Sequence, residues 1–98
     1  MKNSTENFLQ TLETIIADRL ENPSQGSYTA SLATHGTKRV AQKVGEEAVE
    51  LALASVAGDR TEVLNEAADL VYHLLVLLNV QDIRFENVLD VLSERHTG

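Results

Sequence analysis

The sequence predicts an all-α protein: an antiparallel helical hairpin plus flanking helices, which assembles into a four-helix-type bundle by dimerisation. Proline occurs once, aromatic residues make up only 4%, and apolar residues recur at helical spacing along most of the chain. Strands favour aromatic and β-branched residues and need frequent turns, so this composition favours helices over a sheet. The length of 98 residues predicts a single domain over 1–98.

The first predicted helix covers about residues 5–20. Ser4 fits an N-cap, and apolar residues follow at helical spacing through Leu20. Turn-forming residues at 22–26, including the single proline, end this helix. Residues 27–36 fit either a short helix or an ordered loop.

The next two helices are predicted to form the hairpin. One runs from about Thr37 to Ala57, and Gly58 is the natural residue to end it. Asp59 is the predicted N-cap of the following helix, which runs to about Gln81. So short a turn packs the two helices antiparallel. A last helix is predicted at about 84–96.

The helix after Asp59 carries apolar residues around its whole circumference in its second half. Leu70, Val71 and the run 74–78 leave no polar stripe at about 100° per residue. Such a helix needs neighbours on every side, and one short chain has few to offer. The sequence therefore predicts a homo-oligomer, most simply a homodimer.

Composition excludes several other classes of protein. The absence of cysteine rules out disulfides, a thiol nucleophile and cysteine-based zinc sites, and is typical of a cytoplasmic protein. The net charge of −7 disfavours a general nucleic-acid binder. The N-terminus has no apolar region of a signal peptide, and the apolar run 74–78 is too short to span a membrane. We therefore expect neither nucleic acid nor membrane as a partner.

Two pairs of acids lie across the predicted hairpin from each other. Glu47 and Glu50 share one face of the first helix, and Glu66 and Asp69 share one face of the second. Glu50 and Glu66 lie equally far from Gly58, as do Glu47 and Asp69. The antiparallel turn therefore places the two pairs level with each other.

Clustered carboxylates repel one another unless a cation lies between them. Mg²⁺ and Mn²⁺ prefer oxygen ligands, and Mg²⁺ commonly bridges carboxylates to substrate phosphates. The pattern thus favours a magnesium site that binds a di- or triphosphate. The alternative is a solvated acidic face with ion pairs such as Lys43–Glu47.

Other candidates carry weaker signals. Lys43 fits a ligand for a phosphate oxygen or an ion-pair partner of Glu47, and Lys38 fits a phosphate-binding rim or a solvated helix start. His73 lies on the face of the acids but fits a core residue as well. Gly45, inside a helix, indicates close approach of a substrate or of another helix. The two tyrosines, Tyr28 and Tyr72, are expected to pack rather than to stack on bases.

The acids and their flanks resemble a known family. Glu46-Glu47-x-x-Glu50 followed by Glu66-x-x-Asp69 resembles the signature of the all-α, MazG-like NTP pyrophosphatases. The blocks 27–29, 43–50 and 66–77 closely resemble phosphoribosyl-ATP pyrophosphohydrolase of histidine biosynthesis, and the likeness covers about 8–95. This implies Mg²⁺-dependent hydrolysis of phosphoribosyl-ATP to phosphoribosyl-AMP and pyrophosphate.

The resemblance also implies roles for single residues. Glu47, Glu50, Glu66 and Asp69 match the metal ligands, and Glu46 matches an acid that orients water or supports the ligands. Glu46, Glu47 and Glu50 are thus the catalytic candidates, with Lys43, Lys38 and His73 as substrate-binding candidates. Without cysteines for a fused zinc cyclohydrolase, we expect the stand-alone form. A house-cleaning nucleotide pyrophosphatase and an inactive helical interaction module stay open as alternatives.

Overall fold

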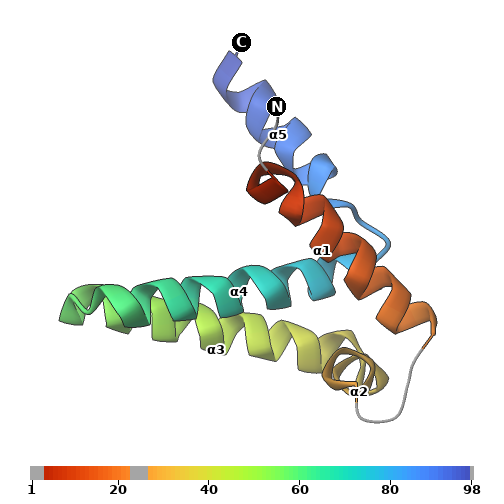
Figure 1. Cartoon of the computed structure of the whole chain (residues 1–98), viewed down its shortest axis with the longest axis horizontal. Helices are drawn as coiled ribbons and strands as arrows, with labels where there is room; N and C mark the ends of the chain where they lie inside the picture. The colour runs from red at the N-terminus through yellow and green to blue at the C-terminus, as the bar shows by residue number, and fades with distance from the viewer. Residues whose placement is uncertain (1–3, 23–26, 98) are drawn as a thin grey trace.

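The computed structural model describes residues 4–22 and 27–97, and every regular element in that part of the chain is a helix, which confirms the all-α class. Figure 1 shows two long helices side by side as a hairpin, with the first and last helices leaving from one end of it. The five helices are α1 (Ser4–Glu21), α2 (Tyr28–Thr34), α3 (Gly36–Ala57), α4 (Arg60–Val80) and α5 (Phe85–Thr97).

The helix boundaries lie close to those expected from the sequence. Ser4 is the first residue of α1 and not its N-cap, because the helix starts one residue earlier than expected. The ambiguous segment 27–36 contains the short helix α2. The predicted turn around Pro23 lies outside the described residues.

The hairpin turn consists of two residues with opposite backbone roles. Gly58 has φ 81° and ψ 18°, a left-handed conformation that glycine adopts without steric cost, and its N–H donates to the carbonyl of Ala54. Asp59 is extended, and its carboxylate accepts a hydrogen bond of 3.2 Å from the backbone N–H of Glu62. One residue therefore ends α3 and the next begins α4.

The core lies where α1, α2 and the hairpin meet. Its buried members come from four helices, so it joins residues that are far apart in the sequence. Tyr72 and Phe85 are among the partly buried residues that pack against it. The core residues are Ile16, Leu32, Val40, Leu75 and Val76.

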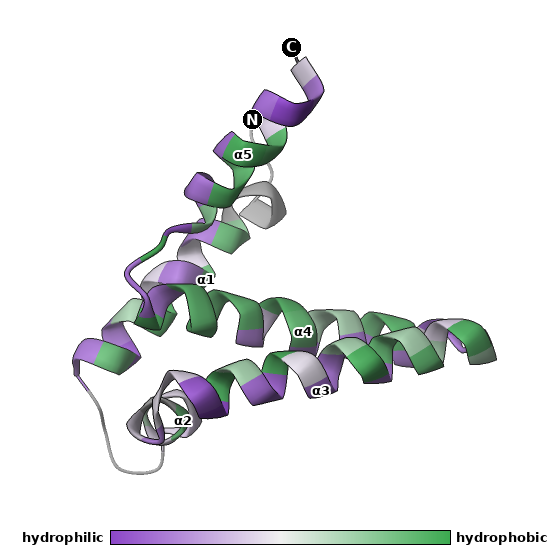
Figure 2. Cartoon of the chain, turned by 180° about the vertical axis from the view of Figure 1, so that it is seen from behind, coloured by the Kyte–Doolittle hydropathy of each residue, from purple (hydrophilic) through white to green (hydrophobic). Residues whose placement is uncertain are grey.

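The far half of the hairpin extends beyond this core. Ala54 is buried there, but larger apolar side chains remain in water: Leu53 is 64% exposed and Val56 is 88% exposed. Figure 2 shows the hydrophobic colouring continuing along α4 and over the tip of the hairpin. Within the single chain, α4 buries only His73, Leu75 and Val76.

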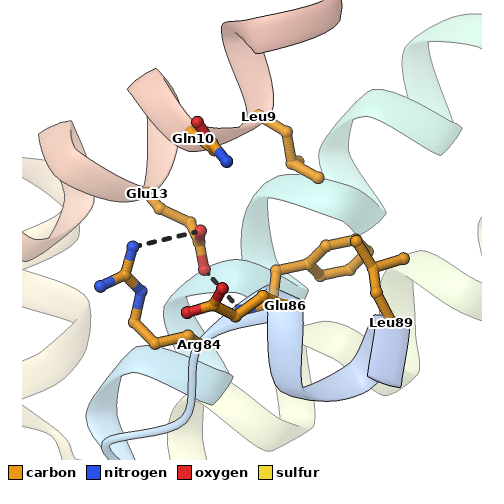
Figure 3. Close-up of a pocket in the computed structure, with 7 residues that line it drawn as sticks. Leu9, Gln10, Glu13, Arg84, Glu86 and Leu89 are labelled. Carbon is orange, nitrogen blue, oxygen red and sulfur yellow. Dashed lines mark hydrogen bonds and ion pairs between the residues drawn. The ribbon is translucent and has the colours of Figure 1, made fainter. Parts of the chain in front are cut away.

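The last helix is attached to the first by a polar contact. The carboxylate of Glu13 accepts a 2.7 Å hydrogen bond from the backbone N–H of Phe85, at the start of α5, and lies 4.0 Å from Arg84 (Figure 3). Glu13 thus caps a helix that lies 72 residues further along the chain. A cavity of about 150 Å³ opens beside this contact, with Leu9 and Leu89 in its wall.

Candidate metal and phosphate site

Three carboxylates from the two hairpin helices converge about halfway along the hairpin. Glu47 on α3 and Glu66 and Asp69 on α4 each offer an oxygen, and these oxygens lie within 4.8 Å of one another. Glu47 is only 6% exposed, Glu66 is half-buried, and Asp69 is open to solvent. The antiparallel register brings these residues together, since Glu47 and Asp69 lie equally far from Gly58.

Glu50 is exposed and is not one of the three converging carboxylates, but it adjoins them through a hydrogen bond with Glu66. The four residues Glu47, Glu50, Glu66 and Asp69 are called the carboxylate cluster below. Burial is the main cause that raises the pKa of the Glu66 carboxyl from 4.5 to about 6. A hydrogen bond with Glu50 and the negative charges of the other three members contribute to the same rise. The cluster is therefore electrostatically strained when no cation is present.

Two oxygens of the cluster have no partner within the described chain. Oε1 of Glu47 and Oε1 of Glu66 are both shut off from solvent and lack a hydrogen bond. A buried carboxylate oxygen without a donor is costly, and a bound cation removes that cost. The donors are all carboxylate oxygens, the ligand type that Mg²⁺ and Mn²⁺ prefer. The residues present therefore fit a hard divalent cation.

Basic and amide groups surround the α3 side of the cluster. Nζ of Lys43 lies 3.6 Å from Oε2 of Glu47 and 3.8 Å from Oε1 of Glu46. Glu46 also accepts a 3.2 Å hydrogen bond from the side-chain amide of Gln42 and faces outward. Lys38 lies exposed in the first turn of α3. Lys43 thus lies beside the cluster, whereas Glu46 is held on the outer side of Lys43.

His73 is buried one helical turn after Asp69, and both of its ring nitrogens are hydrogen-bonded. Nδ1 lies 2.8 Å from the carbonyl oxygen of Asp69, which can only accept, so Nδ1 carries the proton. Nε2 then accepts from the hydroxyl of Tyr28 at 2.7 Å. The neighbouring Thr29 and Tyr72 hydroxyls are hydrogen-bonded as well. Two polar bridges therefore attach α2 to α4 next to the cluster.

Sequence reasoning did not find the partners of Tyr28 and Glu13. The Tyr28 hydroxyl meets a histidine 45 positions away, and no local spacing encodes that contact. The sequence does contain an indication for Glu13. This acid interrupts the apolar stripe of the first helix between Leu9 and Ile16, and such a position favours a buried polar contact.

The fold and the site together define an all-α protein that carries a candidate metal-binding group of carboxylates on a helical hairpin. Comparison with known families gives the particular one: residues 9–96 match the family model of phosphoribosyl-ATP pyrophosphohydrolase. The chain belongs to the phosphoribosyl-ATP pyrophosphohydrolase family. This confirms the family resemblance expected from the sequence.

Curated relatives agree with the family match. The chain is 54% identical over 89 residues to the histidine biosynthesis bifunctional protein HisIE of Vibrio cholerae, and 56% identical over 89 residues to that of Yersinia pestis. It is 48% identical over 97 residues to the protein of the same name from Buchnera aphidicola. These alignments cover 91%, 91% and 99% of this chain but only 42%, 44% and 47% of the relatives. The chain thus spans less than half the length of the curated relatives it matches.

Proposed function

We propose that this chain hydrolyses the α–β phosphoric anhydride of phosphoribosyl-ATP, releasing phosphoribosyl-AMP and pyrophosphate. The observation that carries the proposal is the carboxylate cluster with its two unpartnered buried oxygens, on Glu47 and Glu66. Hydrolysis of a phosphoric anhydride depends on positioning and charge neutralisation rather than on a protein nucleophile. A cation site with the Lys43 ammonium group beside it fits that requirement.

The cluster residues Glu47, Glu50, Glu66 and Asp69 hold Mg²⁺ in this proposal, with Mn²⁺ as the alternative. When bound, the cation supplies neutralisation of phosphate charge and activation of water. Glu47 and Glu50 are the catalytic carboxylates, because they face the second helix of the hairpin at the cluster. Glu46 does not face the cluster, and it positions Lys43 beside the cluster through their ion pair.

Basic and polar neighbours bind the rest of the substrate. Lys43, now paired with Glu47, exchanges part of that ion pair for a phosphate oxygen and neutralises the leaving pyrophosphate. Lys38, exposed at the start of α3, attracts phosphate from solvent. Both ring nitrogens of His73 are already hydrogen-bonded within the chain. His73 therefore contributes to substrate binding indirectly, through its hydrogen bond with Tyr28.

We further propose that the chain works as a homodimer formed along the hairpin. The accessible surface of 7026 Å² exceeds the roughly 5,500 Å² of a compact monomer of this mass. The Cα radius of gyration, 14.9 Å, likewise exceeds the value of about 13 Å for a compact chain of 100 residues. Five exposed large apolar residues lie on the hairpin helices α3 and α4, and a second hairpin packed against them would form a four-helix bundle. They are Val49, Leu53, Val56, Leu64 and Val71.

A protein partner explains the apolar surface of α4 better than a membrane does. By length and composition alone, α4 is apolar enough to cross a membrane. However, Glu66 and Asp69 lie in its middle, and ionised carboxylates are costly in the core of a bilayer. We place the chain in the cytoplasm, as a single domain without membrane or nucleic-acid partners.

The test is a substrate panel with pyrophosphate and phosphate release measured separately. We expect phosphoribosyl-ATP to be turned over with pyrophosphate release, and ATP, dCTP and dUTP to be turned over far more slowly. Comparable turnover of a free nucleotide would instead assign the chain to the house-cleaning pyrophosphatases. Release of inorganic phosphate alone would place the cleavage at a different anhydride bond.

A further inference from the structure

The orientation of Tyr28 is unusual for a tyrosine. A tyrosine commonly buries its ring and leaves its hydroxyl at the wet end. Tyr28 does the opposite: its hydroxyl is bonded to the buried His73, and its side chain remains 52% exposed. The hydrogen bond fixes one end of the residue, so the ring is held in place while much of its surface faces water.

The location of this ring relates it to the carboxylate cluster. Asp69, a member of the cluster, accepts from His73 through its carbonyl oxygen, and His73 accepts from Tyr28 through the other ring nitrogen. The imidazole ring of His73 therefore connects the hydroxyl of Tyr28 to the backbone of Asp69, a proposed metal ligand. The second tyrosine, Tyr72, packs against the core instead and bonds Thr29.

We propose that Tyr28 is a substrate-contacting residue, whose ring stacks on the purine of the substrate while the carboxylate cluster and its cation hold the pyrophosphate. The proposal rests on the proposed function, since phosphoribosyl-ATP carries both groups. Exposed aromatic faces bind bases by stacking without needing a specific hydrogen-bond pattern. The hydroxyl bond to His73 orients the ring in advance, which reduces the entropy lost when the base binds.

The roles of the Tyr28 ring and of the Tyr28 hydroxyl can be tested separately. Tyr28→Leu removes the ring and keeps an apolar side chain, whereas Tyr28→Phe keeps the ring and removes only the bond to His73. Tyr72→Phe is the matched control, because it removes the hydroxyl of the other bridge and leaves Tyr28 intact. We expect Tyr28→Leu to raise KM for phosphoribosyl-ATP about tenfold with a smaller change in kcat, and Tyr28→Phe to raise it much less.

A binding measurement tests the stacking without relying on activity. The probes are α,β-methylene-ADP, whose α–β linkage cannot be hydrolysed, and methylenediphosphonate, which lacks the base. In the presence of Mg²⁺, wild type and Tyr72→Phe should bind the first probe about tenfold more tightly than the second. Tyr28→Leu should lose that difference, and Tyr28→Phe should keep most of it.

Fluorescence provides a second readout that needs no Tyr28 variant. The chain has two tyrosines and no tryptophan, so Tyr28 is the single tyrosine emitter in Tyr72→Phe. Its emission should be quenched by α,β-methylene-ADP and not by methylenediphosphonate. The proposal is overturned if this emission is unaffected, if Tyr28→Leu keeps the base-dependent difference, or if Tyr28→Phe loses it as fully as Tyr28→Leu. If the base-dependent binding is present but wild type releases no pyrophosphate from phosphoribosyl-ATP, the proposed function fails and the stacking site stands.

Discussion

At the scale of single residues, the most informative group is the Glu66 carboxyl. Sequence spacing predicted that Glu66 would meet the acids of the preceding helix, because register follows from the turn. Spacing did not predict that Oε1 of Glu66 and Oε1 of Glu47 would be enclosed without a donor. Enclosure depends on how deeply the two helices pack, which only the folded chain determines. The same limit applies to the bond between Tyr28 and His73.

The raised pKa of Glu66 predicts a pH-dependent stability for the metal-free protein. The carboxyl holds its proton more tightly in the folded chain, where its pKa is about 6, than in the unfolded chain, where it is near 4.5. The free energy of unfolding should therefore fall as the pH rises from about 4.5 to 6 and should stay lower above pH 6. The check is a series of thermal melts after metal removal, comparing wild type with Glu66→Gln.

Glu66→Gln lacks the titrating group, so its melting temperature should fall less over this interval. A parallel pH dependence in the two proteins would contradict the assignment of the raised pKa to Glu66.

At the scale of elements, the hairpin was predictable because its turn is locally encoded. Gly58 ends α3 and Asp59 begins α4, and both do so through hydrogen bonds with residues three or four positions away. The helix α2 was not predictable in the same way. It has only seven residues, and polar bridges from Tyr28 and Thr29 fix it to α4. Ser27 caps its start by accepting a 3.2 Å hydrogen bond from the backbone N–H of Ala30.

Two glycine substitutions, one inside α3 and one in the turn that ends it, should have opposite effects on stability. Gly58→Ala places a side chain at φ 81° and should lower the free energy of unfolding by about 1–2 kcal/mol. Gly45→Ala should raise it by about 0.5–1 kcal/mol, since a Cβ there meets no atom within 4 Å and the helix gains propensity. Urea unfolding of the metal-free proteins measures both changes. If Gly45→Ala destabilises the isolated chain, the space beside Gly45 is not open as described.

At the scale of the whole molecule, the single chain leaves more surface in water than a compact chain of its mass does, and exposed apolar side chains are part of that surface. The sequence indicated this exposed apolar surface, because the second half of α4 lacks a polar stripe. It did not indicate which part would remain uncovered, because that depends on where the other helices pack. The helices α1 and α2 cover the end of the hairpin near the core, whereas α5 points away from the hairpin and the tip is left free (Figure 1).

The dimer proposal predicts that charge on the exposed hairpin surface disrupts assembly. Wild type should show the mass of two 10.7 kDa chains in light scattering at micromolar concentration. Leu53→Glu should shift it toward one chain, because an unpaired charge would be buried at the interface. Thr61→Glu, at an exposed position near the hairpin turn, is the matched control and should remain a dimer. A monomeric wild type would contradict the proposal.

The central claim is that the carboxylate cluster holds a divalent cation needed for hydrolysis, and the most direct measurement is the thermal shift caused by Mg²⁺ in Asp69→Asn. The matched control is Asp90→Asn, an exposed aspartate on α5. Removing one repelling charge should leave the metal-free melting temperature of Asp69→Asn level with wild type or higher. Mg²⁺ should then stabilise this variant less than wild type or the control, and pyrophosphate release should fall by about 100-fold or more. An Asp69→Asn protein that is destabilised without metal, yet keeps the full Mg²⁺ shift and full activity, would contradict the account.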